Sequence, residues 1–485
     1  MANVVVLGGG VSGHTAAAFL KRWLGKQHRV TVVTPNARWN WIPSNIWVGV
    51  GKMKKEQVLF DLAPVYRKVG IEYEQAKGLA IHPEGDAEGA GPFVEVEYTG
   101  QGREGERTRI PFDYLVNATG PKLKFEATEG LGPGGFSESV CTADHAAHGA
   151  EHLERLIDAM KRGERKTFVI GTGHGTCTCQ GAAFEYLFNI DYVLRERGVR
   201  EQADLIWLSN EYELGDFGMG GAHLKQGGFI TNTKIFTESL MAERGVRWIT
   251  RAHVSRVTER EIFYELLDGT EGSLTYDFTM LIPPFSGVGL RAFAKDGSDI
   301  SEKLFAPNGF MRVDADYTGK PYDQWSADDW PKTYQSPLYP HLFACGIAFA
   351  PPHPISKPMK SVKGTPISPT PPRTGMPSAM MGKLVAPNIV AMIRKGTERP
   401  EHTSSMAEIG AACVASTGSS FLKGSAVSMT VFPIVPDFRK YPKYGRDLNL
   451  TFGEIGLAGH WIKYILHRMF LYKAKLKPGW YLIPE

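Results

Sequence analysis

Cysteine is scarce in this sequence, which has only five in 485 residues. So few cysteines exclude a disulfide-stapled scaffold, and the odd count fits thiol or redox chemistry better than structural pairing. Burial as a small apolar side chain is the alternative for most of them. Long apolar runs are also lacking, because none reaches the roughly 18 residues that a membrane-spanning helix needs. No basic segment precedes the first strand, so we expect no cleavable signal peptide.

Net charge is low, at +4, but it is unevenly distributed. Between positions 439 and 477, nine Lys and Arg residues stand against two acidic ones, which leaves the rest of the chain slightly acidic. This distribution argues against nucleic acid as a partner and favours one basic docking surface. The length exceeds what a single hydrophobic core supports, so two or three domains are expected.

The first motif is a strand, a glycine turn and a helix at the start of the sequence. A short strand at 3–7 is followed by Gly8, Gly10 and Gly13 in the spacing GxGxxG, and an alanine-rich helix continues to about Leu24. The first glycine permits a tight turn, the second lets the backbone approach a pyrophosphate, and the third lets helix and strand pack closely. The motif predicts a dinucleotide site with the pyrophosphate at the helix N-terminus.

The next strand, at 29–34, ends without the acidic residue that often binds an adenosine ribose. Thr34 and Asn36 stand there instead, and either side chain could hydrogen-bond a ribose hydroxyl.

A second βαβ pattern follows, with strands expected at 166–171 and 203–209 and a helix to about Arg195. The first strand leads into GTGHGTCTCQGAAFE at 171–185. This is a position for NAD, but Thr176 replaces the third glycine. NAD is therefore disfavoured, although Glu211 could serve as a ribose ligand.

Cys177 and Cys179 fall in the first turn of that expected helix. A helix N-terminus carries about half a positive charge and unpaired N–H groups, so it stabilises a thiolate much as it stabilises a phosphate. We expect the thiol pKa to be lowered there, which favours a reactive sulfur.

Together these segments resemble the sulfide:quinone oxidoreductases, flavoproteins that oxidise sulfide at a three-cysteine site. The resemblance covers nearly the whole chain. Beside the first glycine turn, it rests on WNWIPSNIWVGVG at 39–51, SVCTADHA at 139–146, CQGAAFE at 179–185, ELGDFGMGG at 213–221, LIPPFSGVG at 281–289, PTPPRTG at 369–375 and AACVASTGSSF at 411–421.

The resemblance implies an α/β fold with two Rossmann-like dinucleotide-binding domains, the FAD domain being split in sequence. We expect the FAD domain at 1–125 and 305–395, a second dinucleotide-binding-like domain at 160–304, and a C-terminal region at 396–485 with a redox cysteine and an amphipathic membrane-binding helix. FAD is the implied cofactor, and no metal is expected. A helix is expected to start at about Gly375. The expected FAD-binding residues are Gly8, Gly10, Gly13, Thr34, Asn36, Pro43, Ala118, Thr119, Gly120, Gly346, Arg373, Thr374 and Gly375.

By position, Cys179 resembles the family's central cysteine, Cys413 its redox partner and Cys141 its third cysteine. Sulfide would attack a disulfide or sulfur bridge between Cys179 and Cys413, which requires their α-carbons to lie within about 7 Å. His145 is a further catalytic candidate. Glu185 matches the family's proton-transfer acid, and an ordinary helix carboxylate is the alternative.

The sequence departs from the family pattern in several places. Asp216 stands where the family has a histidine, which places a proton-transfer role in doubt. Cys177 has no family counterpart, and Cys345 lies in a strand where a buried apolar residue suffices. Insertions at 317–339 and 351–372 are expected to reshape the approach of sulfide or quinone.

A helical pattern at 458–472 has one broad apolar arc. The arc comprises Ala458, Trp461, Ile462, Ile465, Leu466, Met469, Phe470 and Tyr472, with His460, Lys463 and His467 opposite. A tryptophan, flanking cations and insufficient length to span are typical of a helix in a membrane interface, and a core-packed helix is the alternative.

We therefore expect a peripheral protein of the cell membrane, on a face that the sequence leaves open, and a homo-oligomer. Sulfide and a lipid-soluble quinone are the expected substrates. Phe349, Phe421 and Phe432 are the candidates to surround the quinone ring, with ordinary core positions as the alternative.

Three other functions stay open. A type II NADH:quinone dehydrogenase shares the nucleotide domains and membrane attachment, but needs no cysteine trio. The flavoprotein of a flavocytochrome c sulfide dehydrogenase would need export and a haem partner, and the sequence has no CxxCH motif. A non-catalytic sulfur-binding flavoprotein is compatible with Asp216 and the insertions.

Overall fold

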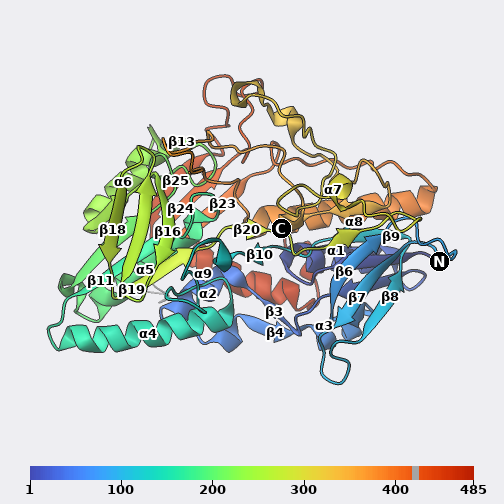
Figure 1. Ribbon diagram of the computed structural model, residues 1–485, viewed down its shortest axis with the longest axis horizontal. Coiled ribbons are helices and arrows are strands. Elements are labelled where there is room, and N and C mark those ends of the chain that lie inside the picture. The colour runs from blue at the N-terminus through green and yellow to red at the C-terminus, as the bar shows by residue number, and fades with distance from the viewer. Residues whose placement is uncertain (418–424) are drawn as a thin grey trace.

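The computed structural model describes residues 1–417 and 425–485, without the side chains of Cys413 and Thr417, and has an α/β fold (Figure 1). Its first sheet has five parallel strands, which are mostly short, apolar and buried on both faces, as parallel sheets require. In spatial order they are β22 (Leu342–Ala344), β9 (Tyr114–Asn117), β1 (Asn3–Leu7), β2 (Arg29–Val33) and β5 (Glu72–Glu74). β22 therefore pairs with β9 although residues 118–341 separate the two strands in the chain.

Two helices pack together beside this sheet, α1 (Val11–Leu24) and α8 (Gly375–Lys395). Their contact is close, because a Cβ on Gly382 would lie 2.2 Å from the Ser12 carbonyl oxygen. The predicted end of α1 and start of α8 are confirmed. Against expectation, α8 is long and apolar enough to cross a membrane, but most of it is buried inside the protein, so it is a core helix of this fold.

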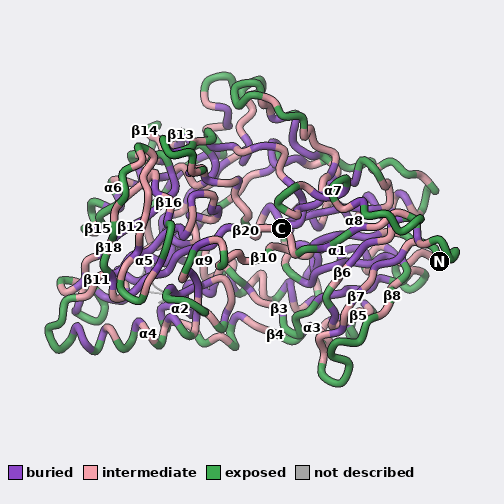
Figure 2. Tube along the Cα trace, in the orientation of Figure 1, coloured by how far each residue is buried: buried purple, intermediate pink, exposed green. Residues whose placement is uncertain are grey.

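A second parallel sheet forms from the second βαβ pattern. Its strands, in spatial order, are β15 (Val246–Ile249), β12 (Ala203–Leu208), β11 (Lys166–Thr172) and β19 (Phe278–Ile282). The main apolar core runs through both parallel sheets, whose strands lie in the buried parts of the chain (Figure 2). The helix after the glycine turn, α5 (Gln180–Glu196), begins after Cys179, so the prediction that Cys177 and Cys179 lie in its first turn is wrong.

A third, mixed sheet contains the last described strands of the chain. In spatial order it comprises β14 (Phe229–Asn232), β13 (His223–Gln226), β25 (Phe452–Gly456), β24 (Ser425–Val431) and β23 (Ala411–Thr417). The edge strand β23 contacts α5 and also α9 (Leu457–Ala474), the helix that follows β25. This sheet therefore connects the second glycine turn with the last helix.

Smaller elements complete the described fold. The strands are β3 (Arg38–Asn40), β4 (Leu59–Asp61), β6 (Ala76–His82), β7 (Phe93–Tyr98), β8 (Arg107–Pro111), β10 (Lys122–Leu123), β16 (Ala252–Val257), β17 (Glu261–Leu266), β18 (Glu271–Thr275), β20 (Phe285–Ser286) and β21 (Arg291–Ala292). The helices are α2 (Asn45–Gly49), α3 (Leu62–Val69), α4 (Ala143–Lys161), α6 (Thr233–Glu243) and α7 (Ser301–Leu304).

Candidate active site

Three thiols come together at the start of α5. Cys179 directly precedes the helix with φ +64°, a left-handed backbone that is uncommon for a residue other than glycine. Its Sγ lies 3.6 Å from the Arg373 carbonyl oxygen. Burial raises the pKa of Cys141 to about 11, and the charge of Cys179 contributes to that shift, so the two sulfurs are within electrostatic reach. Burial also raises the pKa of Cys177, and the charge of Cys179 contributes to that shift as well.

The expected lowering of the Cys179 pKa is wrong. Burial raises this pKa, and the hydrogen bonds with the Arg373 backbone and the Thr178 side chain, together with the Arg373 charge, oppose the shift without reversing it. Because Cys179 lies ahead of α5 in a half-buried position, the loss of water outweighs the helix N-terminus. The guanidinium of Arg373 is a charge that favours the thiolate.

Cys177 and Cys345 are structural. Cys177 is fully buried, and its Sγ donates to the Ile282 carbonyl oxygen at 3.0 Å. Cys345 is also fully buried and accepts a hydrogen bond from Ser12 Oγ at 3.0 Å, and burial raises its pKa to about 12. Buried thiols of this kind are inert.

Cys413 lies in β23, opposite Met429 of β24, and its side chain is outside the described part of the structure. β23 runs against α5, where Glu185 Oε1 accepts hydrogen bonds from Ser416 N at 3.1 Å and Ser416 Oγ at 2.9 Å. The strand of Cys413 is thus attached to the helix that Cys179 precedes. The pairing of the two sulfurs stays a prediction.

The two remaining catalytic candidates have different surroundings. Glu185 is buried and forms an ion pair with Lys463 at 2.9 Å, which is the arrangement of the alternative reading, a satisfied helix carboxylate. His145 lies in the first turn of α4, where its backbone N–H donates to Thr142 Oγ. Burial lowers the pKa of His145, and its Nδ1 has no hydrogen-bond partner among the described residues.

The first glycine turn has the shape that a pyrophosphate requires. A Cβ on Gly8 would lie 2.1 Å from the Ala118 carbonyl oxygen, and one on Gly13 would lie 2.0 Å from the Gly8 carbonyl oxygen. Beside Gly10 there is open space within 4 Å, and no described side chain caps α1. The N–H groups of α1 are therefore available to a phosphate, and the residues present fit a dinucleotide.

The other expected cofactor residues lie around this turn. Thr34 is buried at the end of β2, whereas Asn36 is exposed. Thr119 N and Oγ1 bond the Asn117 side chain, Gly120 follows with φ +72°, and Pro43 is half-buried in the turn before α2.

The N-terminus of α8 is also free of a side-chain cap, because Thr374 is exposed and its side chain makes no cap bond. Gly375 is the first residue of the helix, and Gly346 takes φ +66° nearby, where a Cβ would lie 2.7 Å from Ser12 Cβ. The Arg373 guanidinium donates to the carbonyl oxygens of Ile347 (3.2 Å) and Phe349 (3.1 Å). This helix end can receive a partial negative charge.

The second glycine turn is covered by the chain itself. A Cβ on Gly175 would lie 2.1 Å from the Pro366 carbonyl oxygen. Ser368 N donates to the Gly175 carbonyl oxygen at 2.7 Å, and Thr370 N donates to that of Cys177 at 3.1 Å. Residues 366–370 therefore cover the side of this turn from which a pyrophosphate would approach its backbone.

Glu211, the possible ribose ligand, is fully buried, and burial raises its pKa to about 7. It accepts hydrogen bonds from Ser209 Oγ at 2.7 Å and Phe217 N at 2.9 Å. Asp216, close by, bonds Gly218 N and Ser356 of the same insertion, and burial raises its pKa as well. Both acids are bonded within the protein, and buried Glu211 is not exposed to a ribose.

The quinone candidates have separate environments. Phe349 is 1% exposed, with ring contacts to Trp330 and Tyr334 in the core. Phe432 is half-buried, and its backbone N–H donates to Thr451 Oγ1. Phe421 lies outside the described residues.

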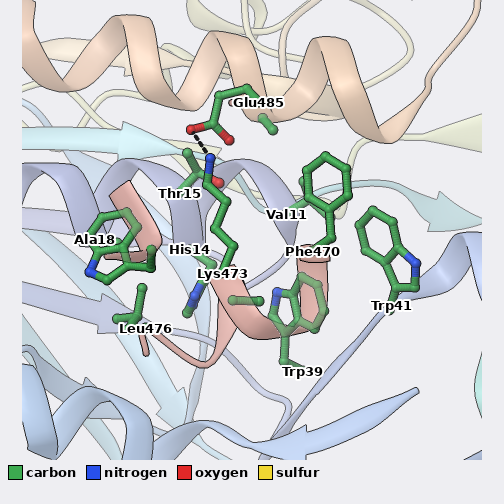
Figure 3. A pocket seen from close by; sticks show the side chains of 13 residues that line it. Val11, His14, Thr15, Ala18, Trp39, Trp41, Phe470, Lys473, Leu476 and Glu485 are labelled. Atoms are coloured by element: carbon green, nitrogen blue, oxygen red, sulfur yellow. Dashed lines mark ion pairs between the residues drawn. The ribbon is translucent and has the colours of Figure 1, made fainter. Parts of the chain in front are cut away.

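An aromatic pocket that the sequence did not predict lies between α1 and residues 470–485 (Figure 3). Trp39, Trp41 and Phe470 line it, and the ion pair between Lys473 and Glu485, at 2.6 Å, lies at its side. His14 lines it too, and burial lowers its pKa to about 4, so this imidazole is neutral at pH 7. The tryptophans at 39 and 41 could have indicated an aromatic site, but Phe470, which also lines the pocket, is far away in the sequence.

The last helix, α9, has buried polar side chains on its inner face and exposed apolar side chains on its outer face. His460 and His467 are buried, and Ser44 Oγ bonds His467 Nδ1 at 2.8 Å. On the outer side Trp461, Ile462 and Ile465 are exposed, at 37%, 48% and 55%. The predicted opposition of the two faces is confirmed for these residues, whereas Phe470 of the predicted arc turns inward and stacks on Trp41.

Residues 2–200 match the family described as pyridine nucleotide-disulphide oxidoreductase. The chain is 29% identical to a sulfide-quinone reductase of Aquifex aeolicus over 473 residues, which cover 98% of this chain and 91% of the relative. The X-ray structure of the sulfide:quinone oxidoreductase from that bacterium has a TM-score of 0.74 at 27% identity, covering 98% of this chain and 92% of that one. The resemblance that the sequence motifs indicated is confirmed.

A structure of NDH2 from Plasmodium falciparum in complex with NADH is similar in fold alone, with a TM-score of 0.60 at 12% identity and coverage of 98% and 96%. The fold therefore does not distinguish an enzyme that uses NADH from one that does not. The matched family and the Aquifex relatives imply a flavin-dependent oxidoreductase.

Proposed function

We propose that this chain, a relative of the sulfide:quinone oxidoreductases over its whole length, catalyses their reaction: it oxidises sulfide at a cysteine site and passes the electrons to a quinone. The observation that carries the proposal is the cluster of Cys141 and Cys179 beside Arg373, next to a strand that brings Cys413 to the same helix. An NADH dehydrogenase has no use for this arrangement.

FAD is the proposed cofactor, and bound FAD would accept an electron pair. The turn at Gly8, Gly10 and Gly13 would hold its pyrophosphate, and the uncapped end of α8 at Gly375 would face the electron-rich edge of the flavin ring. The remaining predicted contacts are proposed on the same basis, as is the division into 1–125 with 305–395, 160–304 and 396–485. The pairing of β22 with β9 supports a split FAD domain.

The cysteines would carry the sulfur chemistry. HS⁻ attacks one sulfur of a disulfide between Cys179 and Cys413, the S–S bond breaks, and a persulfide forms on one cysteine while the other leaves as a thiolate. Joining persulfide and thiolate into a Cys–S–S–S–Cys bridge releases two electrons and one proton. Arg373 would stabilise the Cys179 thiolate, and Cys141 would accept sulfur when the sulfur chain grows.

Absorbance of the protein-bound flavin tests this proposal under anaerobic conditions. Sulfide is expected to bleach the flavin and a short-chain quinone to restore it. NADH is expected to leave it oxidised, because residues 366–370 fill the second glycine turn. Bleaching by NADH and not by sulfide would establish a dehydrogenase instead, and reoxidation by cytochrome c alone would favour the flavocytochrome reading. No response to either donor would favour a sulfur-binding protein without turnover.

Membrane attachment through α9 is proposed as well, with a homo-oligomer as the working assembly. The exposed apolar residues of α9 and the excess of Lys and Arg after position 439 support binding to a lipid surface, from which a quinone can reach the protein without crossing water. The alternative of a core-packed helix fits poorly with this outward apolar face.

Replacing both Ile462 and Ile465 by Ser is expected to weaken binding to anionic phospholipid vesicles. Losing two isoleucine side chains that the lipid would cover is worth about 3 kcal/mol if each contributes about 1.5 kcal/mol. Vesicle co-sedimentation measures the effect. Ile235→Ser is the matched control, because Ile235 is 54% exposed on α6. Equal binding of the double variant and the parent protein would contradict this role of α9.

A further inference from the structure

The open edge of β23 is closed by side chains. β23 is an edge strand of the third sheet, so some backbone groups next to Cys413 face away from β24. Val414 O accepts a hydrogen bond from Lys463 Nζ at 3.1 Å, and Ser416 N donates to Glu185 Oε1 at 3.1 Å. Asn189 Nδ2 donates to Ser416 O. These bonds satisfy buried backbone groups that an edge strand would otherwise leave unpaired.

Lys463 and Glu185 form the centre of this arrangement. Their side chains are 12% and 8% exposed, and they bond one another at 2.9 Å. Each also bonds the strand: Lys463 holds the carbonyl of Val414, and Glu185 holds the amide and hydroxyl of Ser416. Trp47 Nε1 donates to the same hydroxyl at 2.9 Å. One ion pair therefore links α5, β23 and α9.

We propose that Lys463 is a positioning residue: through its bonds to Glu185 and Val414 it fixes the strand that carries Cys413 against the helix that Cys179 precedes. The inference rests on the proposed function of the two cysteines. It gives α9 two faces with distinct tasks, an outer apolar face for lipid and an inner polar face that holds the redox strand. Glu185 acts here as the partner of Lys463, through contacts that leave neither oxygen free.

The positioning role predicts which substitutions of Lys463 loosen β23. Lys463→Met keeps the length of the side chain but loses the bonds to Glu185 and Val414, so β23 should open more often. Lys463→Arg keeps a cation at the same place and should retain most of the effect. Arg468→Met is the matched control, because Arg468 is an exposed cation of the same helix that donates a hydrogen bond to Tyr464 within α9.

Hydrogen exchange of the full-length flavoprotein, followed by mass spectrometry, tests the strand directly and needs no substrate. Amides of 411–417 are expected to exchange about tenfold faster in Lys463→Met, equivalent to about 1.4 kcal/mol. Amides of β12 should be unchanged, as should both regions in Lys463→Arg and Arg468→Met. Unchanged exchange in 411–417, or equal acceleration in β12, would overturn the proposal.

The double variant Glu185→Gln with Lys463→Met excludes another cause. Removing the lysine alone leaves a buried carboxylate without its partner, which by itself destabilises a protein. Exchange should stay fast in the double variant, because the bond to Val414 is still missing. Exchange restored to the parent rate would show that the unpaired charge was responsible, and the positioning role would fall.

Kinetics give the functional readout. Flavin reduction by sulfide should slow by about tenfold in Lys463→Met, equivalent to about 1.4 kcal/mol, whereas quinone reoxidation of flavin reduced by dithionite should be unchanged. If the parent protein is not reduced by sulfide, the proposed function fails, and the exchange experiment still decides whether Lys463 holds the strand. Equal loss in both half-reactions would contradict the inference.

Discussion

The Cys179→Ser variant is expected to keep its flavin and to lose flavin reduction by sulfide, by at least about a thousandfold. A serine hydroxyl forms neither the disulfide nor the persulfide that the proposed reaction requires. The rest of the site should persist, because a serine hydroxyl can also hydrogen-bond the Arg373 carbonyl oxygen and the Thr178 side chain. Stopped-flow absorbance under anaerobic conditions measures the rate.

Cys177→Ser is the matched control for that variant. It changes a thiol two positions earlier that is fully buried and bonded to Ile282, and serine can donate the same hydrogen bond. We expect its rate to stay within about threefold of the parent, or about 0.7 kcal/mol. Retained flavin reduction in Cys179→Ser, or its loss in Cys177→Ser alone, would show that Cys179 is not the reactive sulfur.

Gly10→Ala is expected to fold normally and to be isolated with less than a full complement of flavin. The backbone of Gly10 has φ −74°, which any residue can adopt, and open space surrounds the position of a Cβ. The stability of the cofactor-free protein should therefore change by no more than about 0.5 kcal/mol. A methyl group there would obstruct the approach of a pyrophosphate to the backbone, so flavin affinity should fall by at least about tenfold, or about 1.4 kcal/mol.

Gly13→Ala provides the contrast, since its Cβ would lie 2.0 Å from the Gly8 carbonyl oxygen. It should lower the free energy of unfolding by about 1–3 kcal/mol whether or not flavin is present. Thermal unfolding of both proteins after flavin removal separates the two effects. A full complement of flavin in Gly10→Ala would show that the cofactor does not use this turn.

Local motifs explain why much of the fold could be predicted from the sequence. The strand, glycine turn and helix at 3–24 depend on neighbouring residues, and α1 ends at Leu24 as expected. The start of α8 at Gly375 and the strands of the second βαβ unit are confirmed for the same reason. The predicted start of α5 was wrong, because Cys179 takes a left-handed backbone conformation that its residue type does not indicate.

The site depended on longer-range packing, and the sequence was a weaker guide there. The pKa of Cys179 is set by burial beneath segments distant in the chain, so the local argument from a helix N-terminus gave the wrong direction. The bonds between Glu185, Ser416 and Lys463 join three elements that no spacing rule connects. The aromatic pocket around Trp41 and Phe470 was missed for the same reason.

The seal over the second glycine turn is made of main-chain bonds from Ser368 and Thr370, and no single side-chain replacement removes them. The segment 351–372 also carries Ser356, which donates a hydrogen bond to Asp216. Deleting this segment would therefore remove a hydrogen-bond partner of a buried acid. Exchanging single side chains is therefore not expected to open this turn to a nicotinamide dinucleotide, because the covering bonds come from the backbone itself.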